Sequence, residues 1–187
     1  MSMQQLNNAG YGKKLTEIYL SEKMLRHFQR KILGVEQEAL KIRIEEFLKF
    51  IILSTEIKGC PIPVSQEIDE VWHQWILETQ EYHTLCQQLP SQRYIHHSSL
   101  PNNTTFPASH EEMENQIILD FSWIASYVAN FGKFTEEAVV YWTTAFSLMQ
   151  KMGWSLEYLN SFAQELIGYQ NVRCNPTEFG KIQVSVA

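Results

Sequence analysis

The stretch EQEALKIRIEEFLKFIILSTEI, residues 36–57, decides the fold. Its apolar residues return every three or four positions, which is the repeat of an α-helix with one buried face. The residues on that face are Leu40, Ile44, Phe47, Leu48, Ile51 and Ile52. The pattern predicts an amphipathic helix that ends before Gly59.

The same repeat along the rest of the chain predicts about six helices. Glycine and proline mark several of their ends, and Ser65 is suited to the N-cap of the third. Residues 90–108 hold three prolines and little periodicity, which predicts a long loop, and the tail KIQVSVA is expected to be a short strand or disordered. We therefore predict an all-α fold, a single-domain helical bundle over residues 1–187. The expected helices are 14–33, 36–57, 66–90, 110–130, 135–151 and 155–168.

Composition narrows the class of protein. The formal net charge is −6, from 15 basic and 21 acidic residues, and this balance argues against nucleic acid as a partner. The longest apolar run, FLKFIIL, is short and is interrupted by Lys49, so no membrane span is expected. Three widely spaced cysteines and an N-terminus without a signal-peptide core predict a soluble, cytoplasmic protein, with export by a route that needs no cleavable signal left open.

Five of the six histidines fall between positions 73 and 110. Asp69 and His73 are four residues apart, so a helix places them on one face, one turn apart. The loop after Pro90 can turn back and bring His96 or His97 beside them, whereas Cys86 lies about 20 Å from His73 along a straight helix. The residues Asp69, His73 and one of His96 or His97 are therefore a candidate ligand set for zinc or iron, completed by water. The alternative is a buried, hydrogen-bonded Asp–His cluster that fixes helix geometry.

A longer motif surrounds these residues. The order D-x-x-W-H-x-x-x-L-x-T-x-x-Y-x-x-x-C, starting at Asp69, is followed by I-H-H at 95–97. It resembles the glycine-rich domain-containing protein-like family, whose bacterial members are small proteins of unknown role. The stretches IEEFLKFIILS, PVS and ILDFSWIASYVANFG, together with Trp142, are also similar to that family, so the resemblance covers about residues 40–145. It implies a helical module and does not supply an established reaction.

Two function classes follow from these patterns. The first is a helical interaction or scaffolding module with a structural Asp–His cluster, and its partner would be a protein. The second is a metal-binding protein, with a metal-dependent enzyme as one form of it. In both, aromatic residues of the third helix are expected in the core, and we predict that Trp72 is buried. A Cys–His dyad of His83 and Cys86 is a further, weaker alternative.

Overall fold

The computed structural model of the protein describes residues 14–57, 62–97 and 110–172, with the backbone alone described at 110–120 and 168–172. These ranges contain nine helices and no strand, so the predicted all-α fold is confirmed. The predicted number of about six helices is wrong, because three of the expected helices are each divided into two. Two of the three cysteines, Cys60 and Cys174, lie outside the described residues, as do the tail and the end of the long loop.

The expected helix over 14–33 divides into α2 (Leu15–Tyr19) and α3 (Glu22–Lys31). Leu20 is extended, and Ser21 then begins the next helix as its N-cap. The Ser21 hydroxyl accepts a hydrogen bond from the backbone N of Met24 at 3.2 Å, which satisfies one of the unpaired N–H groups of the first turn. This cap, rather than a change in apolar spacing, causes the division.

The next two helices determine where the candidate site lies. The 36–57 prediction is met closely by α4 (Gln37–Glu56). The helix expected at 66–90 divides into α5 (Gln66–Leu77) and α6 (Thr79–Gln88), because Glu78, with φ −90° and ψ 67°, leaves the helical conformation. The chain changes direction there, so α6 does not continue the axis of α5.

The C-terminal half contains the third division. The expected helix at 135–151 becomes α8 (Glu136–Val139) and α9 (Thr143–Met152), while α7 (His110–Phe131) and α10 (Leu156–Val172) remain single helices. A side-chain amide joins the elements: Asn160 of α10 accepts from the backbone N of Phe134 at 2.8 Å and donates to its carbonyl at 3.0 Å. This pair of bonds fixes the connection between α7 and α8.

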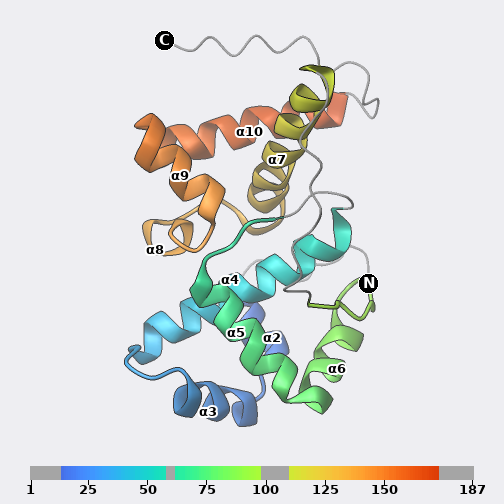
Figure 1. Cartoon of the computed structure of the whole chain (residues 1–187), viewed down its shortest axis with the longest axis vertical. Coiled ribbons are helices and arrows are strands. Elements are labelled where there is room, and N and C mark those ends of the chain that lie inside the picture. Colours follow the sequence, from blue (N-terminus) through green and yellow to red (C-terminus); the bar gives the residue numbers. More distant parts are fainter. Residues whose placement is uncertain (1–13, 58–61, 98–109, 173–187) are drawn as a thin grey trace.

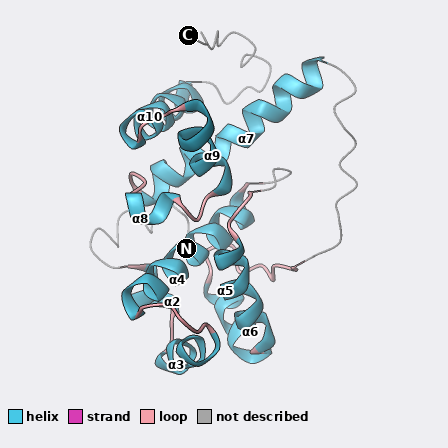
Figure 2. Cartoon of the chain, turned by 60° about the vertical axis from the view of Figure 1, so that its left-hand side comes forward, coloured by secondary structure: helices cyan, strands magenta, loops and turns pink. Residues whose placement is uncertain are grey.

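The helices form two groups with α4 between them (Figures 1 and 2). On one side, α4 contacts α2 and α5, and α5 in turn contacts α3 and α6. On the other side, α4 contacts α7 and α8, and α10 packs on α7 and α9. The long apolar helix recognised in the sequence is thus the element that both groups share.

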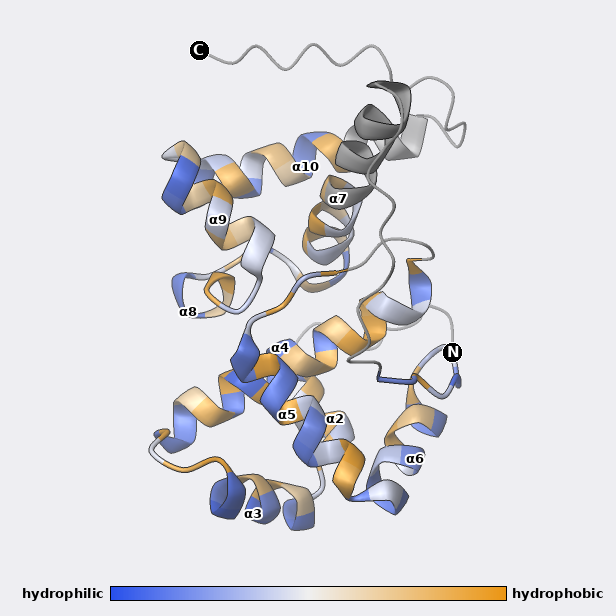
Figure 3. Ribbon diagram, in the orientation of Figure 1, coloured by the Kyte–Doolittle hydropathy of each residue, from blue (hydrophilic) through white to orange (hydrophobic). Residues whose placement is uncertain are grey.

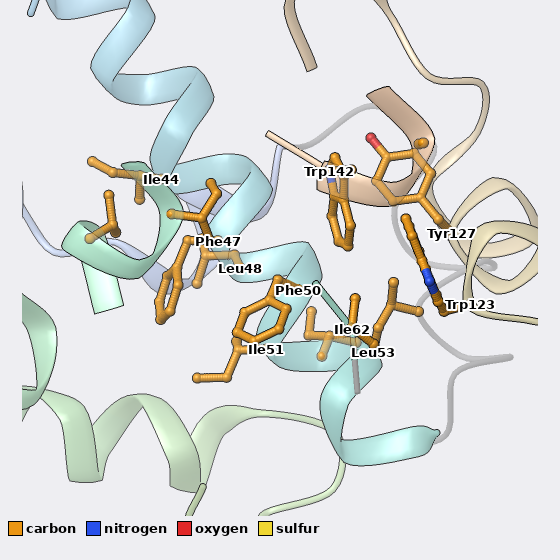
Figure 4. Close-up of a cluster of buried hydrophobic side chains, with 14 of the residues drawn as sticks. Ile44, Phe47, Leu48, Phe50, Ile51, Leu53, Ile62, Trp123, Tyr127 and Trp142 are labelled. Carbon is orange, nitrogen blue, oxygen red and sulfur yellow. The ribbon is translucent and has the colours of Figure 1, made fainter. Parts of the chain in front are cut away.

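One hydrophobic cluster runs from Met24 to Ala163 through both groups. Figure 4 shows side chains of α4 facing Trp123, Tyr127 and Trp142, and Figure 3 shows hydrophobic residues along α4. The predicted burial of Trp72 is wrong in degree: its side chain is only partly buried at the edge of this cluster, whereas Trp75 is 1% exposed. The sequence spacing places both tryptophans near α4 but does not say which one points inward.

A buried polar cluster, not anticipated from the sequence, ties α4 to the group that contains α7 to α10. The Glu46 side chain accepts hydrogen bonds from Trp142 Nε1 at 2.8 Å, from the Tyr127 hydroxyl at 3.0 Å and from Lys49 Nζ at 2.7 Å. Glu46 is 2% exposed, so these three donors compensate for the loss of water. Burial, and secondarily the Glu46 carboxylate, raise the pKa of the Tyr127 phenol.

None of the helices in the described ranges combines the length and the hydropathy that crossing a membrane requires.

Candidate metal centre

The first turn of α5 carries the acidic member of the candidate site. Ser65 stands at the N-cap as predicted, but its side chain makes no capping bond. Its backbone N instead donates to the Tyr141 carbonyl at 2.9 Å, and its own carbonyl accepts from the backbone N of Asp69 at 3.1 Å. This arrangement ties the start of α5 to the segment between α8 and α9. A carboxylate in the first turn also interacts favourably with the helix dipole.

His73 lies one turn further along α5. Its Nδ1 is 2.8 Å from the backbone carbonyl of Asp69 and 3.2 Å from Asp69 Oδ2. Because a carbonyl oxygen only accepts, Nδ1 carries the proton in this contact, and Nε2 is the nitrogen that the ring can offer to a metal ion. A hydrogen bond from one ring nitrogen to a carbonyl is the usual way that a metal-binding histidine is oriented.

The segment after α6 brings the third side chain. The Tyr82 hydroxyl of α6 donates to the Ile95 carbonyl at 2.6 Å and accepts from Trp72 Nε1 at 3.0 Å. Tyr82 is 1% exposed, and burial raises the pKa of its phenol. One phenol thereby attaches residues 93–97, which lie outside any helix, to both α5 and α6.

His97 is delivered to α5 by this attachment. Its Nε2 is 2.9 Å from Asp69 Oδ1, its ring centroid is 4.4 Å from that of His73, and its ring meets the Trp72 ring edge to face at 4.6 Å. One ligand atom from each of Asp69, His73 and His97 lies within 4.8 Å of the other two. The structure therefore brings together three of the four residues singled out from the sequence.

His96 lies apart from this group. Its side chain is exposed, and its ring contacts Tyr94, with centroids 4.9 Å apart. Neighbouring residues of an extended segment point to opposite sides, so His97 faces α5 and His96 faces away.

The Cys–His alternative finds no support in the geometry. Cys86 is 1% exposed, whereas His83 is exposed and its Nε2 contacts the side-chain amide of Gln87 at 3.0 Å. Within the described ranges, neither residue belongs to the group of close ligand atoms. The division at Glu78 overturns the straight-helix assumption behind the predicted 20 Å separation, but not the conclusion that Cys86 stays out of the site.

The donor set is two imidazoles and one carboxylate, which suits zinc and iron. The side chains of His73 and Asp69 are 50% and 45% exposed, while that of His97 is 17% exposed. The group is thus open to solvent at Asp69 and His73, whereas the His97 ring is partly buried against Trp72. An ion held there would have three protein ligands and room for water.

No protein-family model, no curated protein and no solved structure matches this chain. The family resemblance drawn from the W-H and H-H motifs therefore stays a prediction.

Sequence reasoning missed Tyr82 and Trp72 as supports of the site, because both were assigned to the core as apolar bulk. The signal that could have identified them is their polar atoms. Buried Tyr and Trp side chains seek hydrogen-bond partners, and an irregular segment such as 93–97 has unpaired carbonyls to offer.

Proposed function

We propose that this protein binds one divalent transition-metal ion through Asp69, His73 and His97, with zinc or iron as the metal. The observation that supports this most strongly is the convergence of three ligand atoms within 4.8 Å from two separate elements, α5 and the 93–97 segment. An Asp–His pair on one helix is common, but here a third ligand reaches the same point from a separate segment, which the Tyr82–Ile95 hydrogen bond attaches to α6.

Small side-chain movements suffice to close the site around an ion. A tetrahedral zinc ion with bonds of about 2.0–2.1 Å places its ligand atoms roughly 3.3 Å apart. The separation of 2.9 Å between His97 Nε2 and Asp69 Oδ1 is already close to this value. The remaining contraction from at most 4.8 Å requires rotation of exposed side chains on α5 and no change in the helices.

Binding would compete with protons for the same atoms. His97 Nε2–H now donates to Asp69, so in a neutral ring this proton must move to Nδ1 before Nε2 can become a ligand. Metal affinity should fall as the solution becomes acidic, because a ring protonated on both nitrogens has no lone pair for the ion. Three protein ligands leave at least one position for water, which is the arrangement of catalytic metal sites rather than closed structural ones. We assign no reaction to the site.

The test is to titrate zinc into chelator-treated protein that carries no histidine tag, and to measure the binding by calorimetry. The wild type should bind one ion per chain, and His73→Ala and His97→Ala should each abolish binding. His83→Ala is the matched control, because His83 is also an exposed histidine but lies outside the group. Equal binding by all four proteins would refute the proposal.

The second candidate is the helical interaction module with a structural cluster. It is favoured by the hydrogen bonds within the group, since the 2.9 Å contact between His97 and Asp69 can hold segment 93–97 on α5 without an ion. Large apolar side chains at helix ends, such as Leu77 at 71% exposed, also suit a protein partner. Under this alternative, His97→Ala lowers stability and no variant changes the metal content.

A further inference from the structure

A recess of about 350 Å³ lies beside segment 93–97, and none of the three residues of the candidate metal centre is among the described residues that line it. One wall is the C-terminal end of α4, and the other is the segment itself. Both parts lie on the same side of the molecule (Figure 1). This volume falls at the lower end of the range for small-molecule sites. The lining residues are Ser54, Thr55, Ile57, Arg93, Tyr94, Ile95 and His96.

The hydrogen-bond donors of the recess come from one short segment. The hydroxyls of Ser54 and Thr55 donate to helix carbonyls, at 2.9 and 2.7 Å, so they offer the recess only lone pairs. Arg93, Tyr94 and His96 remain as donors, and within the described ranges none of their side chains is paired with a carboxylate. A guanidinium without an acidic partner is suited to bind an oxyanion in a bidentate manner.

Charge and shape select the kind of ligand. Among the described residues, those that line the recess include a permanent cation and no acidic side chain. The carbonyl end of α4 carries about half an elementary negative charge, which opposes an anion, but the Arg93 guanidinium brings a full charge and five donors. Ile57 and Ile95 provide apolar surface beside these donors. The recess thus fits a small anion with an apolar portion.

The segment that lines the recess is already held in place. The carbonyl of Ile95 accepts from the buried Tyr82 hydroxyl at 2.6 Å, and the Tyr94 ring meets the Tyr82 ring edge to face at 5.3 Å. Gln92, with φ 52°, makes the left-handed turn that starts the segment. Little ordering entropy would therefore be lost when a ligand binds.

We propose that this recess is a binding site for a small carboxylate or phosphate, with Arg93 as its cationic contact and Tyr94 and His96 as further hydrogen-bond donors. The site is distinct from the Asp69–His73–His97 group, because His96 and His97 face opposite sides of the same segment. It does not depend on metal binding.

The test uses chelator-treated protein, so that a failure of the metal proposal cannot affect it. Inorganic phosphate and acetate are titrated separately at constant ionic strength, and the backbone amide shifts of residues 93–96 are followed by NMR. At least one anion should saturate these shifts, with a dissociation constant in the millimolar range or below.

Matched variants separate a built site from general charge attraction. Arg93→Gln and His96→Gln change exposed side chains and should each weaken binding about tenfold. Arg26→Gln removes the same charge from an exposed arginine on α3 and should leave binding unchanged. The proposal is overturned if neither anion saturates the shifts, or if Arg26→Gln weakens binding as much as Arg93→Gln.

Discussion

Replacing Tyr82 by phenylalanine tests how the candidate site is held together. The change deletes one oxygen and preserves the ring, which is 1% exposed. It removes the 2.6 Å bond to the Ile95 carbonyl and the 3.0 Å bond from Trp72 Nε1. A net hydrogen bond contributes roughly 0.5–1.5 kcal/mol, and a buried partner left unsatisfied costs more. We expect the free energy of unfolding to fall by about 2–3 kcal/mol.

The same substitution should weaken metal binding, because residues 93–97 lose the Tyr82 bond and His97 is then held at Asp69 less firmly. Loss of an outer partner of a metal ligand typically reduces affinity about 10- to 100-fold. Urea melts of the metal-free protein and zinc calorimetry measure the two effects. Tyr94→Phe is the control, since the Tyr94 side chain is exposed and should change neither quantity. A Tyr82→Phe protein with unchanged stability and unchanged zinc affinity would show that the phenol does not position the site.

Three other predictions concern the core. Glu46→Ala should lower the free energy of unfolding by about 3–5 kcal/mol in urea melts, because it leaves buried donors without their acceptor. Its control is Glu38→Ala, which changes an exposed side chain and should have no measurable effect. The pKa of the Tyr127 phenol is raised in the folded protein, so on a rise in pH the unfolded chain loses this proton first. The contribution of Tyr127 to the free energy of unfolding should therefore be retained below about pH 10 and fall by roughly 1.4 kcal/mol per pH unit above it. Tyr127→Phe should lack this fall when urea melts at about pH 9 and pH 11 are compared. Trp75→Ala should destabilise by about 3–5 kcal/mol and by clearly more than Trp72→Ala, since only Trp75 is fully buried; equal losses in melts would contradict the burial seen here.

The sequence predicted where helices lie better than where they divide. The apolar repeat of 36–57 corresponds to α4 within one residue at each end. The sequence did not predict the division at Glu78, because the residues on both sides of it keep their apolar side chains at helical spacing. A single residue with ψ 67° does not change that spacing. The division at Ser21 did leave a signal, a serine suited to an N-cap, inside a stretch whose periodicity alone predicts one helix.

The candidate site was predictable in part for a similar reason. The four-residue spacing of Asp69 and His73 is read directly from the sequence, and local helix geometry alone then places the two side chains on one face. The choice of His97 over His96 depends on how segment 93–97 is turned, and that is determined by the Tyr82 hydroxyl, thirteen residues from the carbonyl it binds. In the Glu46 cluster, Tyr127 and Trp142 are separated from Glu46 by 81 and 96 positions in the sequence, so no local sequence pattern predicts the cluster.

Anomalous diffraction from crystals of the zinc-loaded, untagged protein tests the central claim most directly. The metal proposal predicts one ion bonded to an oxygen of Asp69 and to one nitrogen each of His73 and His97, at about 2.0–2.2 Å. Crystals soaked in zinc that show no anomalous peak at this group, with His97 still hydrogen-bonded to Asp69, would contradict it.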